Sequence, residues 1–282
     1  MKQEFEGLNV LITGASGGIG WALAQAFGES GAGLLLHAGA RLESLQQRAD
    51  QMPWRERATL ASADVRAPGE LEAMISDFGE RRGRLDICIV NAGIWPSEDR
   101  ALHEVSTERL RRVIETNLLG AMFTARSFLG QLADRGPRGD GRGASLCFIG
   151  STAGRFGERG HSAYAATKAG LAGLTSTLKN EIVELDPWGR VNLVEPGWTV
   201  TDMTREGLAN DAILEAVTAT MPLRQLARPE DVAEAVLMLS SPRRARHLTG
   251  QTLTVAGGME GRRLWSPGSL DAEDLRARME SS

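Results

Sequence analysis

The sequence predicts an α/β fold, a doubly wound parallel sheet of about seven strands with helices on both faces. Short apolar runs alternate with segments of helical periodicity, which is typical of repeated β-α-β units. Several of these runs are apolar throughout, as expected for strands that are covered on both faces. The length of 282 residues and the apolar content of 42% are sufficient for one large core.

Strands are expected in seven apolar runs, in chain order 8–12, 33–38, 59–63, 85–90, 144–150, 190–194 and 251–256. After the first run, Ile19, Leu23 and Phe27 recur at four-residue spacing, which predicts an amphipathic helix that packs on the first strand. A similar stripe predicts a helix before the sixth strand, at Leu171, Leu174, Leu178 and Ile182.

The rest of the chain is organised around these runs. Residues 136–143 are rich in glycine and predict a solvent loop. From Glu260 onward the chain turns polar. We therefore expect a single domain over residues 1–259 and a C-terminal tail over 260–282, which is either a loose terminus with a short helix or a cover for a neighbouring surface.

Composition and charge argue against several classes of function. A net charge of −4 and a pI near 5.7 speak against a nucleic-acid partner. The N-terminal segment lacks the apolar core of a signal peptide, and no run reaches the roughly 18 apolar residues of a membrane span, so we expect a cytoplasmic protein with no membrane partner. Cys88 and Cys147 lie in apolar runs without partners at metal spacing, which predicts buried reduced thiols and no metal site.

The first strand runs directly into the segment TGASGGIG, residues 13–20. Its spacing is G-x-x-x-G-x-G, one residue longer in the turn than the usual dinucleotide fingerprint. Glycines let a backbone approach a phosphate, and the N-terminus of the following helix favours an anion. The turn therefore predicts a phosphate site, the alternative being a tight turn with no ligand.

The end of the second strand should distinguish the two nicotinamide cofactors, because an acidic residue there binds a ribose hydroxyl and an arginine accepts a 2′-phosphate. Ala38 and Gly39 occupy these positions, and Arg41 follows. NADP(H) is therefore favoured, while NAD(H) stays open because Arg41 could simply be solvated. Asp64, directly after the third strand, is a candidate for the adenine amine or for a helix cap.

Tyr164 is the only tyrosine of the chain, and Lys168, four residues later, is one of three lysines. On a helix the two side chains share a face, and an ammonium beside a phenol lowers its pKa. Such a phenol can exchange a proton with a carbonyl or an alcohol. Ser151 ends the fifth strand and could orient the substrate, and Asn117 could hold a water in a proton relay. Each also has a structural alternative, a helix cap for Ser151 and a buried hydrogen-bonder for Asn117.

Taken in order, these stretches resemble the short-chain dehydrogenase/reductase family, most closely its β-ketoacyl-carrier-protein reductase-like branch. The resemblance covers residues 7–259 and is carried by TGASGGIG, ADV (63–65), NAG (91–93), the Asn117 helix, Ser151, the Tyr164–Lys168 pair, EPGWTVTDM (195–203) and the segment 228–259. It implies a Rossmann-like domain that binds NAD(H) or NADP(H) and exchanges hydride with a small-molecule ketone or secondary alcohol.

The resemblance implies roles for individual residues. Asn117, Ser151, Tyr164 and Lys168 would be catalytic, with Tyr164 as general acid in reduction and general base in oxidation. Val200 would meet the nicotinamide carboxamide through its backbone, and Lys168 would also bind the nicotinamide ribose. With the residues argued above, the expected cofactor-binding set is Gly14, Ser16, Gly17, Gly18, Ile19, Gly20, Arg41, Asp64, Val65, Asn91, Ala92, Gly93, Tyr164, Lys168, Pro196, Gly197, Val200 and Thr201.

Substrate specificity is expected in a lid over residues 202–221 and in four candidate pocket residues, Trp95, Phe156, His161 and Trp198. His161 is either a substrate contact or a structural residue. Glu195 departs from the family, which more often carries a small residue there. The resemblance also suggests a homotetramer built through the helices of Asn117 and Tyr164 and the last strand.

The leading hypothesis from the sequence is an NADP(H)-dependent reductase of a ketone. One alternative is an NAD-dependent alcohol dehydrogenase that works oxidatively, for example on a sugar or a hydroxysteroid. Another is a regulatory protein that binds the cofactor without turnover. No residue cluster identifies the substrate.

Overall fold

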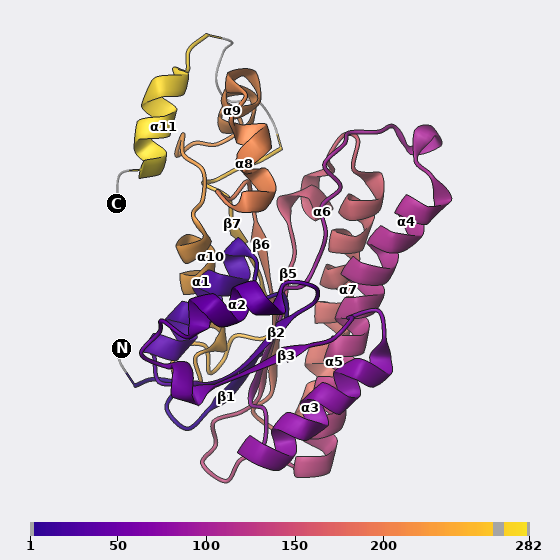
Figure 1. Ribbon diagram of the computed structural model, residues 1–282, viewed down its shortest axis with the longest axis vertical. Coiled ribbons are helices and arrows are strands. Elements are labelled where there is room, and N and C mark those ends of the chain that lie inside the picture. Colours follow the sequence, from indigo (N-terminus) through magenta and orange to yellow (C-terminus); the bar gives the residue numbers. More distant parts are fainter. Residues whose placement is uncertain (1–2, 262–267, 281–282) are drawn as a thin grey trace.

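The protein is built on one parallel β-sheet, seen in a computed structural model that describes residues 3–261 and 268–280 (Figure 1). Its strands are β1 (Asn9–Ile12), β2 (Gly33–Ala38), β3 (Ala58–Ser62), β4 (Ile87–Val90), β5 (Ser145–Ile149), β6 (Arg190–Pro196) and β7 (Thr252–Val255). Every strand overlaps one of the seven predicted runs. The order across the sheet is β3-β2-β1-β4-β5-β6-β7, and all pairings are parallel.

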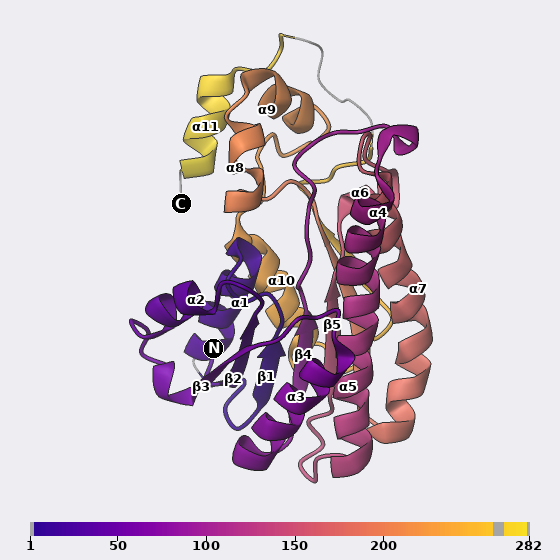
Figure 2. The ribbon, with the colours of Figure 1, turned by 45° about the vertical axis from the view of Figure 1, so that its right-hand side comes forward.

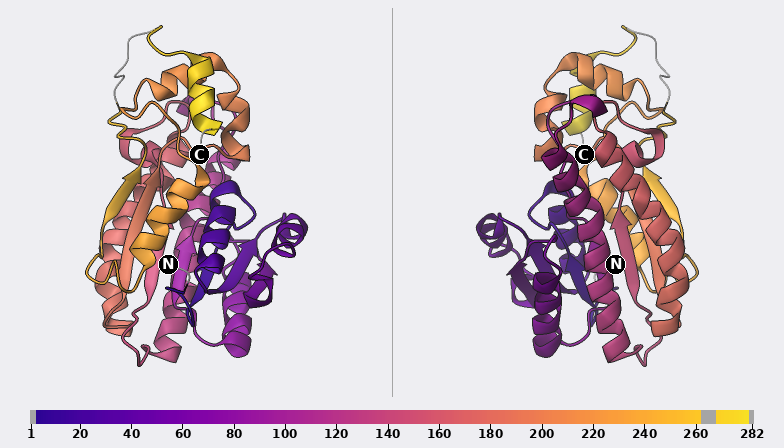
Figure 3. Two further views of the ribbon diagram at one scale, coloured as in Figure 1. Left: turned by 90° about the vertical axis from the view of Figure 1, so that its left-hand side faces the viewer. Right: turned by 90° about the vertical axis from the view of Figure 1, so that its right-hand side faces the viewer.

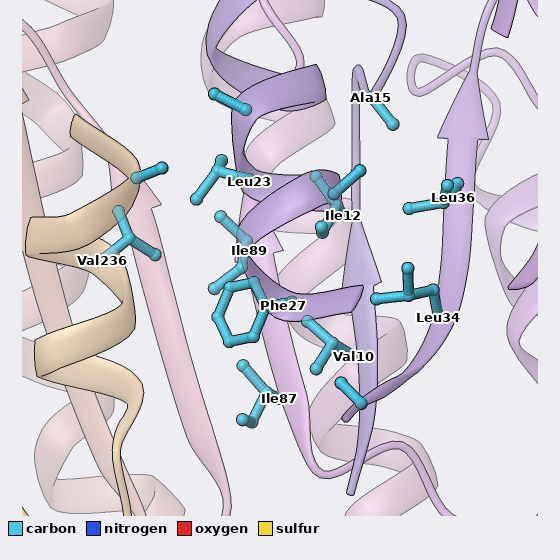
Figure 4. Close-up of a cluster of buried hydrophobic side chains, with 14 of the residues drawn as sticks. Val10, Ile12, Ala15, Leu23, Phe27, Leu34, Leu36, Ile87, Ile89 and Val236 are labelled. Carbon is cyan, nitrogen blue, oxygen red and sulfur yellow. The ribbon is translucent and has the colours of Figure 1, made fainter. Parts of the chain in front are cut away.

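Side chains alternate between the two faces of the central strands, as the period of two residues requires. In β1, Val10 and Ile12 belong to one buried cluster and Leu11 to the other. Figure 4 shows the first cluster, in which Leu23 and Phe27 lie against the side chains of β1, β2 and β4. The predicted stripe of the first helix is thus buried where the sequence placed it.

Helices cover both faces of the sheet (Figures 1 and 2). The first face carries α1 (Gly18–Glu29), α2 (Leu42–Ala49) and α10 (Pro229–Ser240). The second face carries α3 (Pro68–Arg82), α5 (Gly120–Arg135) and α7 (Ser162–Leu185), and α4 (Thr107–Ile114) packs against α7. This is the doubly wound architecture that the sequence predicts.

Short elements complete the connections. They are the 3-10 turns η1 (Arg55–Arg57) and η2 (Leu102–Glu104), the π-helical turn η3 (Glu115–Leu119) between α4 and α5, and the one-turn helix α6 (Thr152–Phe156) after β5. A π-helical turn inside a helical segment is uncommon and often marks a functional region. Here η3 carries Asn117.

A cap of three helices lies at one end of the molecule, as Figures 1, 2 and 3 agree. It consists of α8 (Asp202–Leu208), α9 (Asp211–Thr218) and the C-terminal α11 (Ala272–Glu280). Two of these helices fall within the predicted lid. The third belongs to the predicted tail, of which residues 262–267 and 281–282 lie outside the described residues.

Cys88 and Cys147 are buried, and burial raises the pKa of both thiols, as expected for structural cysteines. Within residues 3–261 and 268–280, no group of acidic, histidine or cysteine side chains could hold a metal ion. In the same part of the chain, no helix is both long and apolar enough for a membrane crossing.

Candidate active site

A cavity of about 1250 Å³ opens at the carboxyl ends of the strands. The strand order reverses between β1 and β4, and in open α/β sheets ligands bind outside the carboxyl ends at such a point. Of the predicted cofactor residues, all but Val200 line the cavity. Among the predicted catalytic residues, Ser151, Tyr164 and Lys168 line it, whereas Asn117 is buried and does not.

The glycines of the first turn are enclosed by the protein itself. Gly14 has a φ of +67°, and a side chain there would meet the backbone of Ala92 at 2.9 Å. At Gly20, a Cβ would lie 2.2 Å from the carbonyl oxygen of Gly14. At Gly18, it would lie 2.7 Å from Thr201. These three glycines therefore allow close packing of the turn, while Gly17 faces a more open space.

The N-terminus of α1 points into this space. Among the described residues, no side chain caps it, and its first turn carries no acidic residue. Its first N–H groups and its dipole are therefore available to an anion. Thr201 packs its methyl group against Gly18 and also lines the cavity. The residues present thus fit the pyrophosphate of a dinucleotide.

Two residues that sequence reasoning missed hold the turn in place. The Oγ1 atom of Thr13 accepts the N–H groups of Asn91 and Ala92 at 3.0 and 3.1 Å. His37 accepts the N–H of Gly14 at Nδ1, 3.2 Å away, and therefore donates from Nε2 to the carbonyl of Ala63 at 2.9 Å. Burial lowers the pKa of His37, which favours this neutral form. His37 is a polar residue inside a strand-like run, and Thr13 follows directly after one, which was the available signal.

The predicted adenosine end carries three basic side chains. Arg41 lines the cavity, with Nη2 at 3.9 Å from the position a Cβ would take on Gly17. Arg48 donates to the carbonyl of Ser16 at 3.5 Å. Arg66 forms an ion pair of 2.6 Å with Asp64, and its hydrogen bond is the main cause that lowers the pKa of that carboxyl. The Asp64 side chain is therefore already paired, which the sequence did not predict.

Asn117 joins η3 to the loop after β4. Its Oδ1 accepts the N–H of Ile94 at 2.8 Å, and its Nδ2 donates to the carbonyl of Ile94 at 2.9 Å. A Cβ on Gly93 would lie 3.3 Å from Asn117 Oδ1 and 3.6 Å from Lys168 Nζ, so Gly93 separates the two side chains. The side chain of Asn117 thus links η3 to the loop after β4. Its part in a proton relay stays a prediction.

Ser151 is both a helix cap and a neighbour of the tyrosine. Its Oγ accepts the N–H of Ala153 at 3.1 Å and so caps α6. It also forms a hydrogen bond with Tyr164, which lies in the first turn of α7 and lines the cavity. The helix cap that the sequence left open for Ser151 is thus confirmed, and its part in orienting the substrate stays a prediction.

Lys168 follows Tyr164 by one helical turn, with Nζ 5.7 Å from the centre of the phenol ring. The ammonium is buried and donates to the carbonyl of Ile149 at 2.8 Å. Burial lowers the pKa of Lys168 to about 8. Burial also raises the pKa of Tyr164 to about 12, against the smaller effect of the Ser151 hydrogen bond. The predicted lowering of the tyrosine pKa by Lys168 is thus not seen in the chain by itself, because burial dominates.

Because Tyr164 is the only tyrosine, its titration can be observed directly. Without cofactor, we expect the phenolate absorbance to rise only near pH 12, and not near pH 10, where an unfolded tyrosine ionises. The pKa of Tyr164 is higher in the folded protein than in the unfolded chain. The stability that this difference contributes is therefore complete below pH 10 and is lost as pH rises through about 12. The measurement is a spectrophotometric titration with circular dichroism, and the Ser151→Ala variant should titrate still higher. A phenolate that appears near pH 8 in folded protein would contradict this expectation.

The segment after β6 borders the predicted nicotinamide end. Pro196, Gly197 and Thr201 line the cavity. Val200 instead packs against buried apolar side chains of the cap helices, which include Leu208 and Leu214. Its N–H donates to the carbonyl of Ala227 at 2.9 Å. A contact of Val200 with the carboxamide through that N–H is therefore not available in this structure, because the bond to Ala227 uses it.

The four predicted pocket residues divide into two pairs. Trp95 and Trp198 line the cavity, with ring centres 6.5 Å apart. Phe156 is 38% exposed and lies outside the cavity, and His161 is buried behind its wall. The His161 ring stacks on Trp95 at 3.7 Å, which makes it a support for the wall, not a pocket residue. Sequence periodicity could not separate these pairs, since all four lie in loops or helix ends.

The C-terminal helix α11 packs on α9 of the cap. Leu275 is buried in a cluster with Leu208, Leu214 and Met221. Arg276 forms an ion pair with Asp211 at the start of α9. The same cluster includes Trp198, which lines the cavity. The described part of the tail therefore supports the predicted lid.

Leu275→Ala should loosen this lid. Loss of the buried side chain costs about 2 kcal/mol, which corresponds to about 30-fold faster amide exchange where the cap opens as a unit. Hydrogen exchange in α8 and α9 measures this, with α3 as internal reference and the exposed Glu273→Ala as control variant. Unchanged exchange in α8 and α9 would show that α11 does not hold them.

Comparisons with known proteins agree with this geometry. The sequence model of one family, described as Enoyl-(Acyl carrier protein) reductase, matches residues 14–260. The 3-oxoacyl-[acyl-carrier-protein] reductase FabG of Vibrio cholerae is 33% identical over 256 residues, which are 91% of this chain and 98% of that protein. The protein of the same description from Escherichia coli K12 is 32% identical over the same shares.

A solved structure is similar over the same extent. It is described as a short-chain dehydrogenase/reductase, glucose/ribitol dehydrogenase, from Brucella melitensis. It superposes with a TM-score of 0.82 at 32% identity and covers 92% of this chain and 98% of its own. The family match ends at residue 260, so α11 lies beyond it.

Proposed function

The chain belongs to the short-chain dehydrogenase/reductase family of oxidoreductases, and from this premise we propose that it reduces a ketone to a secondary alcohol with NADPH. The observation that carries the proposal is the Ser151–Tyr164–Lys168 constellation at the wall of the cavity, opposite a glycine turn that fits a pyrophosphate. When bound, the nicotinamide supplies the hydride.

The side chains of this protein supply the proton and the positioning. Tyr164 has a raised pKa, so it is protonated at neutral pH and can donate to the carbonyl oxygen. Ser151, already hydrogen-bonded to Tyr164, is placed to donate to the same oxygen as negative charge develops there. The Lys168 ammonium lies one turn away and stabilises the phenolate that the transfer leaves.

The protonation state of Tyr164 is compatible with reduction. Because its pKa is raised, the phenol carries its proton at neutral pH, which is the form that donates to a carbonyl oxygen. The names of the FabG relatives, which are reductases of a 3-oxoacyl group, support reduction. The printed name of the Brucella melitensis structure favours a second candidate, an NAD-dependent dehydrogenase of a sugar alcohol.

NADPH is favoured because the adenosine end carries basic side chains and no acid at the second strand. Ala38 and Gly39 stand where an acid would bind the ribose hydroxyls, and Arg41 lies beside the turn. Arg48, whose guanidinium reaches the carbonyl of Ser16, adds positive charge there. Arg41, which lines the cavity, would hold the 2′-phosphate.

A homotetramer is part of the proposal. Ile114, Leu119 and Met122, on the segment around Asn117, are each exposed by more than a third, as is Val183 on α7. Apolar side chains on these helices support an interface through the predicted faces. Sedimentation of the purified protein measures the assembly state.

The experiment that tests the function is a panel of ketones and secondary alcohols, followed by absorbance of the reduced nicotinamide. Reduction of ketones with NADPH supports the proposal. Oxidation of sugar alcohols with NAD as the preferred activity would replace it with the second candidate. Cofactor binding without any turnover would favour the regulatory alternative.

A further inference from the structure

Glu158 is a cavity residue to which none of the roles above applies. It lies in the turn between α6 and α7 and lines the same cavity as Tyr164. Its backbone carbonyl accepts the N–H of His161 at 3.1 Å, which fixes the turn. Its side chain is half-buried, and within the described residues no hydrogen bond or ion pair engages its carboxylate.

The surroundings of this carboxylate are unfavourable for a negative charge. Burial is the main cause that raises the pKa of Glu158, His161 lowers it by a smaller amount, and the charge of Asp99 has the smallest effect and raises it. The negative charge of Glu158 also acts on Tyr164. A half-buried, unpaired carboxylate gains most from a ligand that brings a positive charge.

Two cations near this part of the cavity have other partners. Lys168 donates to the carbonyl of Ile149. Arg155 lies 4.0 Å from the carboxylate of Glu195. Neither side chain neutralises Glu158, so the charge is left facing the cavity.

Aromatic side chains, which can also attract a cation, line the same cavity. Trp95 packs edge-on against Tyr164 at 4.6 Å and against Trp198 at 6.5 Å between ring centres. His161 stacks on Trp95, and its Nε2 is bonded to the carbonyl of Pro96 at 2.8 Å, so the indole is held in place. Indole rings attract ammonium groups as well as apolar ones.

We propose that the substrate of this enzyme is a ketone with a cationic ammonium group, which Glu158 pairs with while Trp95 and Trp198 flank it. The inference rests on the proposed ketone reduction and names its substrate class, amino ketones and the corresponding amino alcohols. A neutral polyol could bond to Glu158 but brings no positive charge to the carboxylate or to the indoles. A substrate with its own carboxylate would be repelled.

The test compares two ketones of equal shape, one ending in a trimethylammonium group and one in a tert-butyl group. Wild-type protein should reduce the charged ketone with at least about tenfold higher kcat/KM, mainly through a lower KM. In Glu158→Gln this ratio should fall close to one, because only the charged ketone loses a partner. The matched control is Glu98→Gln, which removes a negative charge from the exposed loop outside the cavity and should keep the preference.

The outcomes separate the two proposals. Equal reduction of both ketones by wild-type protein overturns the ammonium subsite and leaves ketone reduction standing. An equal loss for both ketones in Glu158→Gln also overturns it, because it indicates a structural role for the residue. If the protein reduces neither of these two ketones and no ketone of the panel, the proposed function itself is overturned.

Discussion

Tyr164→Phe is expected to lower kcat for ketone reduction by about 10³-fold or more, since the variant removes the phenol hydroxyl that we propose as the proton donor while keeping the ring. The packing of the ring on Trp95 at 4.6 Å should be retained, and so should the fold. The rate of NADPH oxidation with saturating ketone measures the loss.

Binding of NADPH provides the control for this variant. The glycine turn and the α1 N-terminus do not contact the phenol hydroxyl, so the dissociation constant for NADPH should change little. Titration of tryptophan fluorescence, with Trp95 and Trp198 in the cavity, reports it. A Tyr164→Phe protein that reduces ketones at the wild-type rate would remove Tyr164 from the mechanism.

The second large effect concerns cofactor choice. Arg41→Ala is expected to raise KM for NADPH by about 10- to 100-fold, the scale of a lost hydrogen bond to a charged phosphate. KM for NADH should hardly change. Adding Gly39→Asp should reverse the preference, because the new carboxylate would repel the phosphate and bind the ribose hydroxyl. A Cβ at Gly39 meets nothing within 4 Å, so the substitution has room.

The ratio of kcat/KM for the two cofactors measures this preference. Arg55→Ala is a suitable control, since Arg55 pairs with Asp50 and does not line the cavity. An unchanged ratio in Arg41→Ala would show that Arg41 is solvated and that another group binds the 2′-phosphate. A strong preference of the wild-type protein for NADH would contradict the choice of NADPH.

The strands and the placement of Tyr164 beside Lys168 could be predicted because their signals are local. Strands buried on both faces must be apolar along their length, so β2 coincides with the run predicted at 33–38. Tyr164 and Lys168 are four residues apart on one helix, which fixes their common face. The glycine turn lies at a strand-to-helix junction that the pattern itself defines.

Other features of the site depend on contacts between distant parts of the chain. The side chain of Asn117 bonds to Ile94, 23 residues away, and no local pattern specifies that pairing. His161 lies three residues from Tyr164 and was a candidate for the pocket, but it stacks on Trp95 from behind. Burial reverses the predicted shift of the Tyr164 pKa, and burial is a property of the whole fold.

The sequence by itself determined the order of strands and helices along the chain and the position of the glycine turn, because these follow from periodicity and short spacing. It also predicted the Ser151, Tyr164 and Lys168 set. Only the tertiary structure decided which side chains face the cavity. It placed Glu158 and two indoles inside, moved His161 and Phe156 out, and seated α11 on the cap. The physical reason is that orientation and desolvation arise from packing between segments far apart in the chain, which no local pattern encodes.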